Sequence, residues 1–264
     1  MPRNLRDAVV VVTGASSGIG RATALAFARR GANLVLAARR PAPLEGAARD
    51  CAAHGVRAVA LPTDVADAAA MRELARAAAA TFGRIDVWIN NAGMSLWGPF
   101  AAIPLAAQAR LIEVNLLGVI HGAHAVLPHF LGQGGHGVLI NLASIAGRVP
   151  LPWAATYTAS KCAVAGFTDA LRYELAAHSA IAVCGVYPAF VDTPTDRHSA
   201  NYTGRALRPV PPVADPEAVA EQIVGLALRP RRALYVGAQH ALAAPAALLP
   251  EPTGRALGRL GARY

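Results

Sequence analysis

Lysine is almost absent from this sequence of 264 residues. Of its 25 lysines and arginines, 24 are arginines, and the single lysine is Lys161. A lysine ammonium is a compact charge whose pKa responds to its surroundings, whereas an arginine guanidinium stays charged in a rigid fork. The one position that uses lysine therefore directs attention to the segment Tyr157-Thr158-Ala159-Ser160-Lys161.

Cysteine is also scarce. Cys51, Cys162 and Cys184 are odd in number and lack the spacing of metal ligands. This pattern excludes a disulfide framework, predicts no metal site and favours a reducing compartment. We therefore expect a cytoplasmic protein.

Long apolar runs, internal repeats and low-complexity linkers are missing as well. Without a run of about 20 apolar residues, no membrane span is predicted, and the length suits a single α/β domain. We expect this domain over residues 1–237, followed by a tail, 238–264, that packs on the domain or on a subunit partner. The alternative for the tail is a helix lying on a membrane, since three of its arginines, Arg255, Arg259 and Arg263, would share one helical face.

Negative charge is outnumbered, with 16 acidic against 25 basic residues and a net charge of +9. Such a balance raises nucleic acid as a partner. The arginines are dispersed, however, with no interleaved aromatic residues and no zinc or helix-turn-helix signature. We expect no nucleic-acid partner.

The spacing of Tyr157 and Lys161 places a phenol and an ammonium one turn apart on the same face of a helix. A nearby cation favours the phenolate and lowers the pKa of the tyrosine. A phenol tuned in this way suits general acid–base catalysis. The alternative is an ordinary surface pair, because Tyr-x-x-x-Lys is frequent by chance.

The residues from Val9 to Gly20 read as a buried strand, a glycine-rich turn and the start of a helix. The turn has the spacing Gly-x-x-x-Gly-x-Gly, at Gly14, Gly18 and Gly20. In this context backbone amides and a helix N-terminus can approach a pyrophosphate without interfering side chains. The alternative is a glycine-rich turn that binds nothing.

Strand and helix patterns alternate along the rest of the chain, which predicts right-handed crossovers and a Rossmann-like, doubly wound sheet of about seven parallel strands with helices on both faces. Strands are expected near 8–13, 33–38, 56–61, 85–90, 137–142, 181–187 and 233–236, and helices near 18–30, 42–54, 67–82, 104–131, 156–178 and 215–228. The polar or glycine motifs follow strands, so they should form one rim at the carboxyl ends of the sheet.

These motifs, in this order, resemble the short-chain dehydrogenase/reductase family over roughly residues 7–237. The cofactor turn is Thr-Gly-x-x-x-Gly-x-Gly, and Ala189 stands where the family more often has glycine after Pro188. The resemblance implies catalytic residues Asn115, Ser144, Tyr157 and Lys161. It implies cofactor contacts at Gly14, Ser16, Ser17, Gly18, Ile19, Gly20, Asp64, Val65, Asn91, Ala92, Gly93, Tyr157, Lys161, Pro188, Val191 and Thr193.

The resemblance also implies a mechanism. Tyr157 would exchange a proton with a carbonyl or alcohol oxygen while hydride moves, and Ser144 would hydrogen-bond that oxygen. Lys161 would lower the pKa of Tyr157 and hold the nicotinamide ribose, and Asn115 would anchor a proton-relaying water. Taken alone, Ser144 reads as a strand-end cap and Asn115 as a polar helix residue.

The cofactor can be argued from the second strand, which ends Leu36-Ala37-Ala38-Arg39-Arg40 without the acid that marks NAD. An arginine fork pairs with a 2′-phosphate. We therefore expect NADP(H), with Arg39 as the main contact, Arg40 as a second, and a hydrogen bond from Ser16. The alternative is that both arginines are solvated and either cofactor binds.

The substrate is predicted to be a small carbonyl compound or alcohol with an apolar or aromatic part, from Ser95, Leu96, Trp97, Trp153 and Phe190. Either tryptophan could instead be a core or interface residue. Arg197, His198, Arg205 and Arg208 would allow an anionic group. A mean hydropathy of +0.35 predicts a homodimer or homotetramer. A reductase of acyl chains on an acidic carrier protein, 3-oxoacyl-(acyl-carrier-protein) reductase, and a cofactor-sensing protein without turnover are the alternative functions.

Overall fold

The computed structural model describes residues 4–194, 199–207 and 211–239. Its main sheet has seven parallel strands in the order β3-β2-β1-β4-β6-β7-β9. The strands are β1 (Val9–Thr13), β2 (Asn33–Ala38), β3 (Ala58–Pro62), β4 (Val87–Asn90), β6 (Gly137–Leu142), β7 (Ile181–Pro188) and β9 (Ala233–Val236). The expected doubly wound sheet is therefore confirmed.

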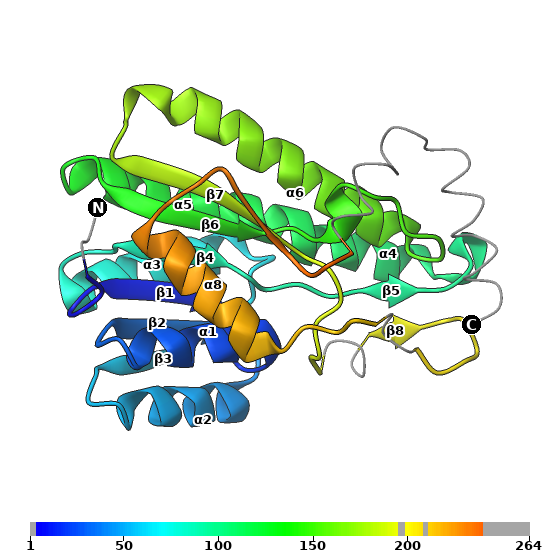
Figure 1. Ribbon diagram of the computed structural model, residues 1–264, viewed down its shortest axis with the longest axis horizontal. Coiled ribbons are helices and arrows are strands. Elements are labelled where there is room, and N and C mark those ends of the chain that lie inside the picture. The colour runs from blue at the N-terminus through cyan, green and yellow to red at the C-terminus, as the bar shows by residue number, and fades with distance from the viewer. Residues whose placement is uncertain (1–3, 195–198, 208–210, 240–264) are drawn as a thin grey trace.

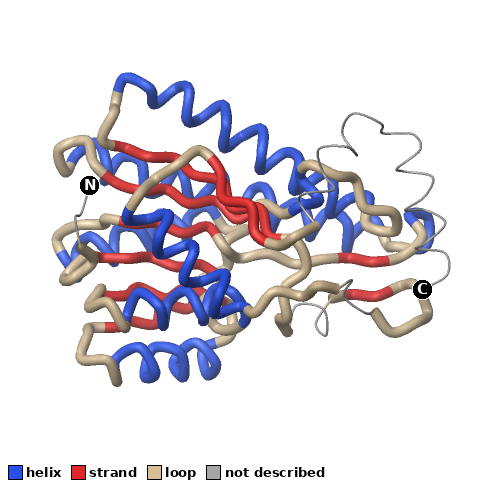
Figure 2. The backbone as a smooth tube through the Cα atoms, in the orientation of Figure 1, coloured by secondary structure: helices blue, strands red, loops and turns tan. Residues whose placement is uncertain are grey.

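Helices cover both faces of this sheet (Figures 1 and 2). One layer contains α1 (Gly18–Ala28), α2 (Pro41–Ala52) and α8 (Pro216–Leu228), and the other contains α3 (Ala68–Phe82), α4 (Leu105–Ile112), α5 (Gly118–Gly132) and α6 (Ala155–Glu174). Figure 1 shows α8 crossing in front of the sheet, beside α1. This arrangement leaves the ends of the strands open for a ligand.

The valine run of β1 explains the central position of this strand. Val10 and Val12 pack into the core beneath α1 and α8, whereas Val11 packs into the core beneath α3 and α5. Side chains alternate between the two faces of a strand, so a strand covered on both faces is apolar throughout. Burial of these side chains in both cores fixes the register of β1 with β2 and β4.

The helix expected near 104–131 is continuous but irregular. A π-helical turn, Glu113–Leu117, joins α4 to α5 and contains Asn115. A π turn, with hydrogen bonds from residue i to residue i+5, was not expected from the sequence. By length and composition the stretch Leu105–Gly132 could cross a membrane, but half of its most apolar window is buried inside the fold.

A second sheet of two short parallel strands was not expected. Its strands are β5 (Leu96–Trp97) and β8 (Ala200–Asn201), which lie side by side beyond the main sheet (Figure 1). Two-residue strands are too short to show an alternating pattern. The small sheet joins the segment after β4 to the segment that follows β7.

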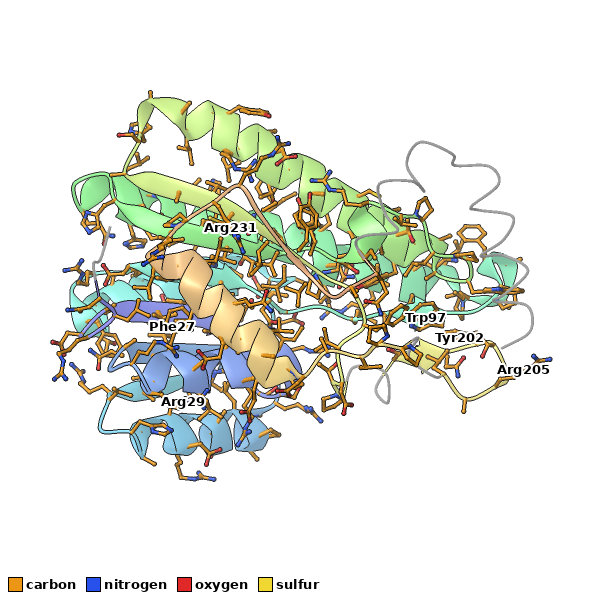
Figure 3. The ribbon with its side chains drawn as sticks, in the orientation of Figure 1. Phe27, Arg29, Trp97, Tyr202, Arg205 and Arg231 are labelled. Carbon is orange, nitrogen blue, oxygen red and sulfur yellow. The ribbon has the colours of Figure 1, made fainter. Side chains whose placement is uncertain are left out.

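Several expectations concern residues outside the described ranges. They include the packing or membrane binding of the tail beyond residue 239 and the anion contacts of Arg197, His198 and Arg208. The domain boundary at residue 237 also stays a prediction. Arg205 is described and is exposed, at the edge of the molecule (Figure 3).

Candidate active site

A cavity of about 590 Å³ lies at the carboxyl ends of the main strands. Its wall brings together residues that follow β1, β2, β3, β4, β6 and β7. Every residue predicted to bind the cofactor lines it, as do Ser144, Tyr157 and Lys161. Of the four residues predicted to be catalytic, Asn115 is the one that does not line it. The structure thus places the separate sequence motifs around one space.

The glycine turn after β1 has the geometry of an anion cradle. Gly14 and Gly18 have φ angles of +67° and +52°, a backbone region that residues other than glycine rarely adopt. A Cβ atom at Gly20 would overlap the carbonyl oxygen of Gly14. Helix α1 starts at Gly18 and has no acidic residue in its first turn. Its free amides and dipole therefore suit a phosphate group.

Thr13, which sequence analysis did not single out as a site residue, fixes this turn to the end of β4. Its hydroxyl accepts hydrogen bonds from the backbone amides of Asn91 (3.0 Å) and Ala92 (3.1 Å). The Asn91 side chain donates in return to the carbonyl of Thr13, at 2.8 Å. Asn91 thus holds two strand ends together as well as lining the cavity. The position of Thr13 at the end of the first strand was the available signal.

The basic residues after β2 lie at the rim of the same cavity. Arg39 and Arg40 are exposed and line it. Asp64, also on the wall, pairs with Arg110 of α4 at 2.5 Å. Partial burial opposes ionisation of Asp64, but hydrogen bonds from the Ala66 amide and from Arg110 together hold its pKa below the usual value. The charge of Arg39 acts in the same direction.

Lys161 is buried beneath the cavity floor, with 5% of its surface exposed. Its Nζ donates a hydrogen bond of 2.9 Å to the carbonyl oxygen of Leu142, at the end of β6. The same atom lies 5.8 Å from the centre of the Tyr157 ring. Burial lowers the pKa of Lys161 from 10.5 to about 8. The ammonium is therefore held next to the phenol in an environment that disfavours its charge.

Burial of this ammonium should reduce the stability of the cofactor-free protein. Below about pH 8 the lysine is charged in both the folded and unfolded states, so the free energy of unfolding is lowered by the full cost of burying the ammonium. As pH rises from about 8 to 10.5 the folded state loses the proton first, and stability should increase. Lys161→Met is expected to raise the free energy of unfolding at pH 7 by up to about 3 kcal/mol.

Urea unfolding of both proteins at pH 7 and at pH 10 measures this effect. The advantage of the methionine variant should shrink at the higher pH. An equal difference at both values would mean that the charge of Lys161 carries no cost in the fold.

Asn115 is held by hydrogen bonds to two neighbouring segments. Its side-chain oxygen accepts from the amide of Met94 (2.8 Å), and its Nδ2 donates to the carbonyl of Met94 (2.9 Å) and to Ser160 (3.1 Å). The amide group therefore pins the segment after β4 to α6. Anchoring of a water by Asn115 stays a prediction.

Ser144 caps a short helix, as its position after a strand indicated, and it also lines the cavity. It caps the short 3-10 helix Ile145–Gly147, accepting a hydrogen bond of 3.2 Å from the amide of Ala146. Its hydroxyl also faces the carbonyl oxygen of Pro188 at 3.5 Å, at the limit of hydrogen bonding. Ser144 lines the cavity at the same time. The long contact leaves the hydroxyl proton available for another acceptor.

Part of the cavity wall is apolar. Leu151, Phe190 and Trp97 form this part, together with the hydroxyl groups of Ser95 and Ser199, which contact each other. Trp97 lies beside Tyr202, whose amide donates to the Trp97 carbonyl at 2.6 Å (Figure 3).

Two residues proposed for this pocket lie elsewhere. Leu96 is fully buried in a satellite core, and Trp153 is exposed. Trp153 has a left-handed φ of +66°, and its carbonyl accepts a hydrogen bond from Gly98. Neither side chain lines the cavity. Of the apolar positions proposed for substrate contact, Trp97 and Phe190 are the two that face this space.

Comparison with known proteins finds one family model, short chain dehydrogenase, that matches residues 8–202. A curated relative from Bacillus subtilis (strain 168), the uncharacterized oxidoreductase YxnA, is 35% identical over 263 residues, covering 98% of this chain and 73% of its own length.

Solved structures show the same likeness. A short chain dehydrogenase/reductase from Burkholderia phymatum in complex with NAD superposes with a TM-score of 0.82 at 28% identity, covering 91% of this chain and 92% of the other. An alcohol dehydrogenase from the archaeon Thermococcus sibiricus complexed with 5-hydroxy-NADP has a TM-score of 0.74 at 28% identity, with coverage of 87% and 94%.

Proposed function

This chain belongs to the short-chain dehydrogenase/reductase family, and from that premise we propose that it is an NADP(H)-dependent oxidoreductase acting on a carbonyl or secondary alcohol. The observation that carries the proposal is the placement of Ser144, Tyr157 and the buried Lys161 on the wall of the cavity that also contains the glycine cradle. A group that binds phosphates and a group that moves a proton thus face the same space.

The residues present fit a nicotinamide dinucleotide. The cradle at Gly14 and Gly18 suits the pyrophosphate, and Asp64 and Val65 would border the adenine. Arg39 and Arg40 stand at the rim where a 2′-phosphate would lie, with no acidic side chain at the end of β2. The preference for NADP(H) rests on this charge, since a carboxylate there would repel a phosphate and an arginine pairs with it. Among the solved relatives, one is bound to NAD and another to an NADP derivative, so the family as such does not decide the choice.

The chain's own residues would perform the proton chemistry. Tyr157 donates a proton to the carbonyl oxygen in reduction and accepts it in oxidation. The Lys161 ammonium, 5.8 Å from the ring, favours loss of that proton from the phenol. Ser144, whose hydroxyl is weakly held by Pro188, donates a hydrogen bond to the same substrate oxygen. The bound nicotinamide supplies or accepts the hydride.

The substrate that fits best is uncharged around its reacting carbon and carries an apolar or aromatic group. Leu151, Phe190 and Trp97 would contact this group. A panel of aliphatic ketones, aryl ketones, steroids, sugars and acyl thioesters with NADPH tests the proposal. We expect the highest kcat/KM among the apolar ketones. Preference for acyl thioesters would instead favour the reductase of carrier-bound acyl chains.

We also propose a homo-oligomer in the cytoplasm. Leu105 and Tyr173 are 79% and 66% exposed on α4 and α6, the helices that the family pairs across a dimer axis. Large apolar side chains on an exposed helical surface favour association. Light scattering at micromolar concentration should give the mass of a dimer or tetramer. A mass of 27.2 kDa, that of one chain, would refute this expectation.

A further inference from the structure

A partly buried cluster of three side chains joins the 3-10 helix after Ser144, strand β7 and helix α6. Arg148 follows the 3-10 helix, Tyr187 lies near the end of β7, and Asp169 is on α6. None of the three lines the cavity. None of the three belongs to a sequence motif named above, and the proposed chemistry does not use them.

The guanidinium of Arg148 contacts both other residues of this cluster. It donates a hydrogen bond of 3.0 Å to the Tyr187 hydroxyl, and its Cζ lies 4.7 Å from the centre of the Tyr187 ring. It also pairs with the Asp169 carboxylate at 3.6 Å. Tyr187 is fully buried, and its ring stacks on Tyr235 of β9 at 5.0 Å. Arg148 is therefore held against both the ring and the hydroxyl of a fully buried residue.

The turn between Ser144 and Arg148 transmits this restraint. Ser144 caps the start of the 3-10 helix, and Arg148 closes its end by donating its amide to Ile145 at 2.8 Å. Gly147, inside the turn, touches the backbone of Lys161 so closely that a Cβ atom would approach its carbonyl oxygen to 2.7 Å. A shift at Arg148 therefore moves Ser144 relative to α6.

The catalytic serine needs this support because the contact made by its hydroxyl proton is weak. Its hydroxyl reaches the carbonyl oxygen of Pro188 only at 3.5 Å. Tyr187 directly precedes Pro188, so Arg148 connects the turn of Ser144 to the residue beside its acceptor. We propose that Arg148 is a positioning residue that, through Tyr187 and Asp169, holds Ser144 in register with Pro188 and with the helix of Tyr157. This inference rests on the proposed function of Ser144.

The chain offers a clean test, because removal of Arg148 should not unfold the protein. Asp169 keeps Arg172 (2.5 Å) and Arg232 (3.0 Å) as partners, so no unpaired charge remains. Arg148→Met is expected to lower kcat about 10-fold, as a small misplacement of a catalytic group does. The KM for NADPH should stay within about 2-fold, because Arg148 does not line the cavity.

The matched control is Arg232→Met, which removes another partner of Asp169 but does not contact Tyr187 in the described residues. It should leave kcat unchanged. The deciding comparison repeats Arg148→Met in a Ser144→Ala background. If Arg148 acts through Ser144, Arg148→Met should lower kcat by less than about 2-fold in the Ser144→Ala background, since the effects of residues that act as a unit are not additive. An equal loss in both backgrounds, or no loss in either, would overturn the inference.

A measurement that needs no turnover separates this inference from the proposed function. Amide hydrogen exchange of the segment 144–148 should be faster in Arg148→Met than in Arg232→Met, with the exchange of β1 unaltered. Unchanged exchange in the segment would contradict the positioning role even in an active enzyme. Faster exchange in a protein that reduces no carbonyl compound would support the restraint and reject the oxidoreductase function.

Discussion

Lys161→Arg is expected to lower kcat/KM at least about 100-fold, although it restores the basic residue that the chain uses everywhere else. The ammonium fits a buried space between Leu142 and Tyr157, and the planar guanidinium is larger and cannot place its charge at the same point. Tyr157→Phe should cause a loss of similar size, because it removes the proton itself. Steady-state rates with the best ketone of the panel measure both.

The double variant is the sharper part of this prediction. If the two residues act as one acid–base unit, its loss should be far smaller than the product of the single losses. Circular dichroism and NADPH binding serve as controls for folding. Near-full activity in a folded Lys161→Arg protein would contradict the argument from the single lysine.

Arg39→Asp is expected to reverse the order of the two cofactors. In the unaltered protein kcat/KM should be higher with NADP(H), and the substitution should reduce it about 100-fold by replacing a charged hydrogen bond with repulsion. Efficiency with NAD(H) should change little or rise, because the carboxylate can accept hydrogen bonds from a ribose.

Arg72→Asp provides the control for net charge. Arg72 is exposed on α3 and does not line the cavity, so this variant changes the total charge equally without touching the rim. Its ratio of kcat/KM with NADP(H) to kcat/KM with NAD(H) should equal that of the unaltered protein. A native preference for NAD(H), or the same shift in both variants, would refute the role of Arg39.

Much of the site could be predicted because parallel strands end at one edge. Gly14, Asp64, Asn91 and Ser144 each follow a strand, so correct identification of the strands was enough to place them around one cavity. The glycine turn could also be predicted, because its two positive φ angles require glycine at those positions.

The contacts between side chains could not be predicted in the same way. The acceptor for Lys161 is the carbonyl of Leu142, a backbone group that carries no sequence signal. The pairing of Asp64 with Arg110 joins residues 46 positions apart and depends on where α4 packs. Nothing in the sequence distinguishes Arg148 from the other arginines, and its contact with Tyr187 appears only in the fold. Such contacts are set by tertiary packing, which periodicity does not encode.

The central claim is that this protein moves hydride from a nicotinamide to a carbonyl carbon while Tyr157 supplies the proton. The most direct measurement uses NADPH deuterated at the transferring position, an apolar ketone of the panel, and mass spectrometry of the alcohol formed. The account predicts one deuterium at the carbinol carbon with the unaltered protein and almost none with Tyr157→Phe. A protein that binds NADPH but transfers no deuterium to any carbonyl compound would contradict it and point to cofactor sensing without turnover.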